Sequence, residues 1–216
     1  MSEYFEELRS FYGLIELNKI IAKGFGFSDK QPAVFANRVY QGGKSELILV
    51  TGPESDIKDC FNAGTRTNTD DRLENGESIE EIFEDTRKLL VSEGARRFKA
   101  AAAWMLRAEL SSRNLDRAIY ASICLEVLLG DRETSDRIGL SKLMANRCAY
   151  SLGQNDADRK SIIQSFLEFY KLRSEIVHSG RTSMNAKERG LVNTGLKLAK
   201  RMLSDEVRRV LVVDED

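Results

Sequence analysis

The sequence contains little of the residue types that build metal and disulfide sites: one histidine, His178, and three cysteines in 216 residues. One histidine and scattered cysteines show no recognisable zinc-ligand spacing. The odd set Cys60, Cys124 and Cys148 argues against a disulfide framework and favours a reducing compartment. We therefore expect no metal, no cofactor and a cytoplasmic location.

Long apolar runs are also missing, so the sequence predicts no membrane span. The N-terminal segment MSEYFEELRS is acidic and lacks the basic and apolar regions of a secretory signal. No Gly-x-Ser-x-Gly hydrolase elbow occurs. The GGKS segment at 42–45 lacks the first glycine of a phosphate-binding loop, since Arg38 stands in its place, and we interpret it as a turn.

Charge is divided along the chain, although the formal net charge is only −1. Residues 1–95 carry 11 Lys/Arg and 18 Asp/Glu, whereas residues 96–210 carry 22 Lys/Arg and 13 Asp/Glu. The first part therefore has a net charge of −7 and the second of +9, and an acidic tail follows at 211–216. A basic half of this size favours contact with a polyanion, and a solvated surface without a partner is the alternative.

Proline is confined to Pro32 and Pro53, so nothing interrupts a helical pattern in the rest of the chain. Around these prolines, β-rich runs at 33–40 and 46–51 flank the turn residues 41–44 and predict a hairpin. A polar loop is expected at 56–76. Spacing and capping residues then predict helices over 78–92, 96–110, 114–129, about 136–153, 157–178 and about 186–203, and a short helix or frayed tail follows.

The predicted fold is thus mainly α: an antiparallel helical bundle with a small α+β N-terminal region that contains the hairpin. We expect an acidic N-terminal region at 1–90, a helical domain at 91–210 and the tail at 211–216.

The helix over 157–178 is apolar around more than half of its circumference. One stripe contains Ile163, Phe166, Leu167, Tyr170 and Val177, and a second beside it contains Phe169, Leu172 and Ile176. A helix packed on one side needs an apolar stripe of about 100° or slightly more. The surplus favours burial on two sides, either against a second copy of the chain or as a central helix of a larger monomer.

Arg173 and His178 flank the first stripe on opposite sides, with Ser174 between them. Five residues of helix separate them by about 140° around the axis and about 7.5 Å along it. They cannot form one compact contact within a helix, but a facing helix with the same pair would complete a site. His178 alone at a helix end is also typical of a C-terminal cap, where the macrodipole favours a protonated imidazole.

The segment LEFYKLRSEIVHSG resembles the HEPN superfamily, and most closely its ApeA-like domains. The positions that match the family pattern Tyr-x-x-Arg-Ser-x-x-Val-His-Gly, a form of Arg-x(4–6)-His, are Tyr170, Arg173, Ser174, Ile176, Val177 and His178. The segment AIYASICLEVLLGDRETSDRIGLSKLMANRCAYSLG resembles the two preceding helices, so the similarity spans about 92–205. Ser179 departs from the family, which often has a glycine there, while Gly180 is retained.

The resemblance implies a metal-independent endoribonuclease, active as a homodimer in prokaryotic antiviral defence, abortive infection or as a toxin. It implies catalytic roles for Arg173 and His178, and we expect Ser174, Tyr170 and Arg181 to bind substrate. Tyr170 can stack on a base, or it can belong to the core. Expected partners are RNA, a second copy through the motif helix and a defence-system protein. The alternative is a HEPN module that binds nucleic acid or protein without cleaving.

Overall fold

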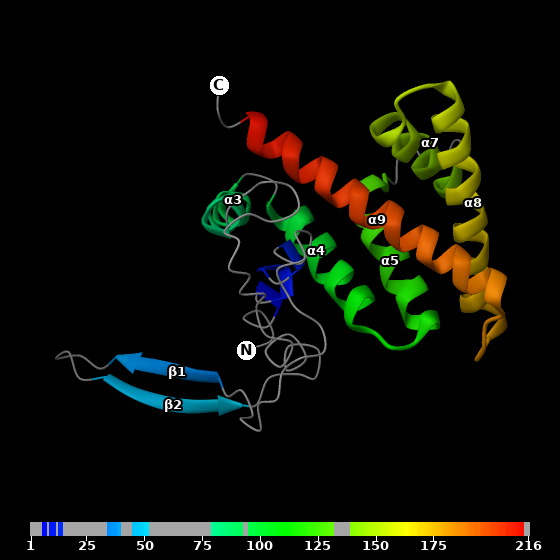
Figure 1. The fold of residues 1–216 in the computed structure, drawn as a ribbon. Coiled ribbons are helices and arrows are strands. Elements are labelled where there is room, and N and C mark those ends of the chain that lie inside the picture. The colour runs from blue at the N-terminus through cyan, green and yellow to red at the C-terminus, as the bar shows by residue number, and fades with distance from the viewer. Residues whose placement is uncertain are drawn as a thin grey trace.

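The computed structural model describes residues 6–7, 9–11, 13–14, 34–39, 45–51, 79–92, 95–131 and 139–213, and these are mainly helical (Figure 1). This confirms the prediction of a helical bundle. The helices are α3 (Ile79–Val91), α4 (Ala95–Leu110), α5 (Asn114–Leu129), α7 (Leu140–Leu152), α8 (Asp156–Ser179) and α9 (Ala186–Val213). The predicted loop at 56–76 and the predicted starts at Ser78 and at Ser135 or Asp136 lie outside the described residues.

Ahead of the helices, strands β1 (Val34–Val39) and β2 (Ser45–Thr51) pair in an antiparallel register, with Asn37 opposite Leu47. The turn expected at 41–44 lies outside the described residues. Parts of residues 6–14 are described, as helix. The α+β character of residues 1–90, and their separation from the rest as a domain, therefore stay predictions.

Helix ends follow the local chemistry of their caps. Asn185 begins α9 with a capping box: its side chain accepts from the Glu188 amide at 3.0 Å, and the Glu188 carboxylate accepts from the Asn185 amide at 2.8 Å. Asn155, one residue before the expected cap at Asp156, caps α8 by accepting from the Asp158 amide at 2.9 Å.

The last helix is longer than expected, since α9 continues to Val213 where the sequence predicts an end near residue 203. Two ion pairs support the extra turns. Asp205 binds Arg209 at 2.8 Å within the helix, and Glu206 binds Arg97 of α4 at 2.6 Å. The second pair depends on the packing of α9 against α4, so the sequence of α9 alone does not indicate it.

The bundle core is built from α4, α5, α7, α8 and α9. In Figure 1 α9 crosses the molecule, and it packs against α4 and α5, which form one helical hairpin, and against α7 and α8, which form another. Small residues allow close approach: Ala101 and Ala102 of α4 and Ala118 and Ala121 of α5 are fully buried. Gly195 of α9 lies directly against α8, because a Cβ there would lie closer than 3.0 Å to the Phe169 ring.

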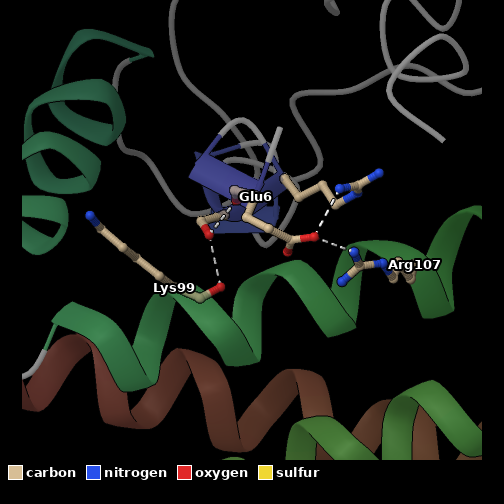
Figure 2. Close-up of polar contacts among 5 residues, drawn as sticks. Glu6, Lys99 and Arg107 are labelled. Atoms are coloured by element: carbon tan, nitrogen blue, oxygen red, sulfur yellow. Dashed lines mark hydrogen bonds and ion pairs between the residues drawn. The ribbon is translucent and has the colours of Figure 1, made fainter. Parts of the chain in front are cut away.

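The described N-terminal residues lie on α4 (Figure 2). Glu6 accepts hydrogen bonds from Arg107 at 2.7 Å and from Arg9 at 2.9 Å, and the Ser10 hydroxyl donates to the Lys99 carbonyl at 2.9 Å. Leu14 is buried in the same core as the bundle helices. The first residues therefore contribute to the hydrophobic core of the helical part.

Candidate active site

Helix α8 carries the motif residues, and its two ends are well defined by the sequence. Asn155 caps its start, and Gly180, which follows its last residue, has the left-handed conformation, φ 61° and ψ 32°. This conformation is common just after a helix end and favours glycine. His178 consequently lies in the last turn of α8, where the free carbonyl groups give the helix end a partial negative charge.

The two apolar stripes of α8 have different surroundings. The stripe of Phe169, Leu172 and Ile176 is buried in the core. The other stripe is only partly covered: Phe166 is fully buried, Ile163 and Leu167 are half-buried, and Val177 is 49% exposed. The single chain therefore leaves the end of this stripe, beside His178, open to solvent.

Arg173 is held by α5, which runs antiparallel to α8 at this point. Its Nε donates to the Ser122 hydroxyl at 3.1 Å, and one terminal nitrogen pairs with Glu126 Oε1 at 3.0 Å. The guanidinium also lies 5.6 Å from the ring centroid of Tyr170. Its side chain stays 23% exposed, so solvent or a ligand can reach it. The arginine is thus fixed in orientation but not sealed in the core.

Glu126 is the centre of this polar cluster. The same Oε1 that pairs with Arg173 accepts a hydrogen bond from the Tyr170 hydroxyl at 2.9 Å. Burial, and then the negative charge and hydrogen bonding of Glu126, raise the pKa of Tyr170 to about 12. The phenol is therefore protonated at neutral pH and cannot act as a general base there.

His178 is exposed and forms no hydrogen bond or ion pair with the residues that the structure describes. Its neighbour Ser179, which departs from the family pattern, donates its hydroxyl hydrogen to the Glu175 carbonyl and so stays within the helix. The imidazole is therefore accessible to a bound substrate.

The other predicted substrate-binding residues differ in availability. Ser174 is half-buried, and Tyr170 stacks on Phe166 at a centroid distance of 6.0 Å while its hydroxyl is engaged. Arg181 pairs with Glu188 at 2.7 Å and with Glu175 at 3.6 Å, so an incoming phosphate must compete with two carboxylates. Arg173 and His178 are brought to the same helix end, but not into contact.

Thiol chemistry is disfavoured at the two described cysteines. Burial raises the pKa of Cys124 and of Cys148 to about 12, so neither is a reactive thiolate at neutral pH. Cys60 lies outside the described residues. Among the residues that are described, no three His, Cys, Asp or Glu side chains converge as metal ligands. Nor is any described helix long and apolar enough to cross a membrane.

Sequence reasoning missed Ser122 and Glu126 as part of the site. They lie 51 and 47 positions before Arg173, so no local pattern connects them to it. One signal was present: Glu126 is the only charged residue of α5 after Arg117, and it stands in an otherwise apolar stretch. A lone carboxylate on such a helix generally has a partner, because burying an unpaired charge is costly.

None of the comparisons, with family models, curated proteins or solved structures, finds a match to this chain. The relation to the HEPN superfamily therefore rests on the motif helix and the helices before it, and it stays a prediction.

Proposed function

We propose that this protein is a homodimeric, metal-independent endoribonuclease of the HEPN type. The observation that carries the proposal is the open end of α8. There a partly exposed, anchored Arg173 and an exposed His178 flank an apolar stripe whose last residue, Val177, is uncovered. A second copy of α8 packed on that stripe would bring two arginines and two histidines together.

The residue types suit RNA cleavage through the 2′-hydroxyl. One His178 imidazole takes the proton of the 2′-OH, whose oxygen then forms a bond to the adjacent phosphorus. The P–O5′ bond breaks, and the leaving oxygen receives a proton from a second imidazole. Arg173 stabilises the charge that develops on the phosphate. The products are a 2′,3′-cyclic phosphate and a 5′-OH.

The need for both an acid and a base favours the dimer. Each chain has one histidine, and a single imidazole cannot be unprotonated and protonated in the same step. A two-fold arrangement supplies one imidazole for each role. The unprotonated imidazole acts as the base, and the protonated one acts as the acid. Action in prokaryotic antiviral defence, with a partner protein of that system, is the context that the resemblance implies.

A second function is favoured by the contacts of Arg173. Because its guanidinium already binds Glu126 and Ser122, the arginine can be a structural link between α5 and α8. The protein would then be a HEPN module that binds nucleic acid or another protein without cleaving. Both functions are compatible with a dimer, so cleavage has to separate them.

The decisive experiment is an RNase assay in EDTA with product ends analysed. Wild type, His178→Gln and Arg173→Lys are compared on mixed RNA and on 2′-O-methyl RNA, which lacks the nucleophile. Loss of the histidine is expected to reduce the rate by about 10²–10⁴-fold. Loss of the arginine fork is expected to reduce it by about 10²–10³-fold.

The control is Lys160→Gln, an exposed residue in the first part of α8, 13 residues before Arg173. It should cleave as wild type does, and all variants should keep the same circular dichroism spectrum and oligomeric state. Cyclic phosphate ends from wild type and control alone support the enzyme. If His178→Gln cleaves at the wild-type rate, or if wild type binds RNA without cutting it, the non-catalytic module is favoured.

A further inference from the structure

A second feature of the bundle, separate from the end of α8, is a surface pocket where α4, α5 and α9 meet. Its volume is about 260 Å³. This lies slightly below the range of about 300–1,000 Å³ usual for drug-sized ligands, so it suits a small group. The lining residues are Glu109, Arg117, Asn193, Leu196, Lys197 and Lys200.

Half of the residues that line the pocket are cations. Arg117 of α5 and Lys197 and Lys200 of α9 provide three positive charges against the one carboxylate, Glu109 of α4. Asn193 and Lys197, and Lys197 and Lys200, are four and three residues apart, so one face of α9 presents all of them. The lining therefore carries an excess of positive charge, and a concave site of that kind attracts anions.

The cations of the pocket are not neutralised by carboxylates in the part of the chain that the structure describes. Lys197 and Lys200 form no ion pair there, whereas Arg97, Arg181 and Arg209 each do. Arg117 has one side-chain contact, a 3.4 Å hydrogen bond to Asn114, and its buried Nε has no partner among the described residues. A buried donor without an acceptor is uncommon in folded proteins, and the guanidinium of Arg117 has no carboxylate partner among the described residues.

We propose that this pocket binds a phosphate group, with Arg117, Lys197 and Lys200 as its ligands. Phosphate oxygens match both the charge and the donor inventory of these side chains. The site does not require Arg173 or His178 to be catalytic, so it goes beyond the proposed function. Its phosphate can come from an RNA strand or from a free nucleotide.

An RNA strand is the source that the fold favours. Arg181, three residues after His178, is bound to Glu188 in the first turn of α9, which ties the end of α8 to the start of α9. Asn193 and Lys200 lie 7 and 14 residues beyond Ala186, or about 10 to 21 Å along the helix axis. Asn193, Lys197 and Lys200 lie about 120–180° around α9 from Glu188, so a strand that crosses the end of α8 reaches the pocket by passing over α9.

The test uses the full chain and equilibrium binding, so it does not depend on cleavage. The pocket variant is Lys197→Gln with Lys200→Gln, and the matched control is Lys142→Gln with Lys160→Gln, two exposed lysines on α7 and α8 with the same total charge change. The probes are a short 2′-O-methyl oligoribonucleotide and ATP, with inorganic phosphate as competitor. Equal melting temperatures for both variants establish that they fold alike.

For an RNA phosphate, the slope of log affinity against log salt should fall by about 1.4 in the pocket variant, since each lost contact to a single strand contributes about 0.7. The control should keep the wild-type slope. Loss of ATP binding with RNA binding unchanged also supports the site and assigns the phosphate to a free nucleotide. Equal losses in the two variants, or no binding of any probe by wild type, overturn the proposal.

Discussion

Replacing Glu126 with glutamine tests the polar cluster that holds the motif arginine. The change removes the negative charge and keeps the side-chain volume. The amide oxygen can still accept from Tyr170 and Arg173, at the 2.9 and 3.0 Å positions where the carboxylate now accepts. What is lost is the ion pair itself, and with it the charge-assisted part of both hydrogen bonds.

The size of the effect follows from the exposure of the pair. Fully exposed ion pairs contribute about 0.2–1 kcal/mol, and breaking a buried pair costs about 3–5 kcal/mol. The side chains of Arg173 and Glu126 are 23% and 27% exposed, between these limits. We therefore expect Glu126→Gln to lower the free energy of unfolding by about 1–2 kcal/mol. For a chain of this length that corresponds to a decrease in melting temperature of about 2–8 °C.

Two assays measure this prediction. Thermal denaturation at pH 7 gives the loss of stability, with Glu168→Gln as control, because Glu168 is an exposed carboxylate whose one hydrogen bond among the described residues is from Gln164. Titration of phenolate absorbance, corrected with Tyr170→Phe, gives the pKa of Tyr170. That pKa should fall from about 12 toward the usual value of 10, and stay above it because burial, the largest cause of the shift, remains.

The sign of the linkage can be checked in the same samples. A tyrosine with a raised pKa stabilises the fold below the usual pKa of 10, and the stabilisation is lost as the pH rises through about 12. The reasoning fails if Glu126→Gln and Glu168→Gln are equally stable and the Tyr170 titration is unchanged. It also fails if Glu126→Gln and Arg173→Gln are additive in a double-mutant cycle, because residues in direct contact should couple.

Three further changes test other parts of the structure. Val177→Asp should prevent dimer formation in analytical ultracentrifugation and keep the helical circular dichroism spectrum, because this side chain is 49% exposed; Val91→Asp, at a valine that is 75% exposed, should remain dimeric. Glu188→Gln should be less stable than wild type to urea at neutral pH, because hydrogen bonding to the Asn185 backbone holds the pKa of the carboxyl below its usual 4.5. This difference should close as the pH falls through the lowered pKa, and a constant difference would contradict the assignment. Gly195→Ala should lower unfolding free energy by about 1–3 kcal/mol in the same assay, because its Cβ would overlap an aromatic ring of α8; full stability would show that the helices can separate at little cost.

Much of the helical part could be predicted because the residues that cap its helices lie close in sequence to the helix ends. Asn185 followed three residues later by Glu188 is a capping box in the sequence and in the structure. Gly130, Gly153 and Gly180 lie directly after the ends of α5, α7 and α8. Each of these signals depends on residues within one turn of helix, and a sequence contains all of them.

The errors in the predicted helix end and in the predicted site arise where contacts between residues far apart in sequence determine the structure. The sequence predicts an end of the last helix near residue 203 and a short helix or frayed tail after it, whereas α9 continues without a break to Val213. The pair between Glu206 and Arg97, 109 positions apart, supports the helix beyond residue 203. The Glu126 cluster was missed for the same reason. The sequence located Arg173 and His178 along α8, whereas the partners of Arg173 on α5 could be found only from the packing of the two helices.

Those partners do not by themselves decide between a structural and a catalytic arginine. A guanidinium has five N–H donors, and the contacts with Ser122 and Glu126 engage Nε and one terminal nitrogen. The other terminal nitrogen forms no hydrogen bond with the described residues, so donors remain for a phosphate. An anchored guanidinium also loses less conformational freedom when it binds, which favours a role in the transition state. The negative charge of Glu126 acts in the opposite direction, because it lies beside the position a phosphate would take. A structural arginine therefore predicts that Glu126→Gln and Arg173→Lys change stability alone, whereas a phosphate-binding arginine predicts that they change RNA cleavage in opposite directions.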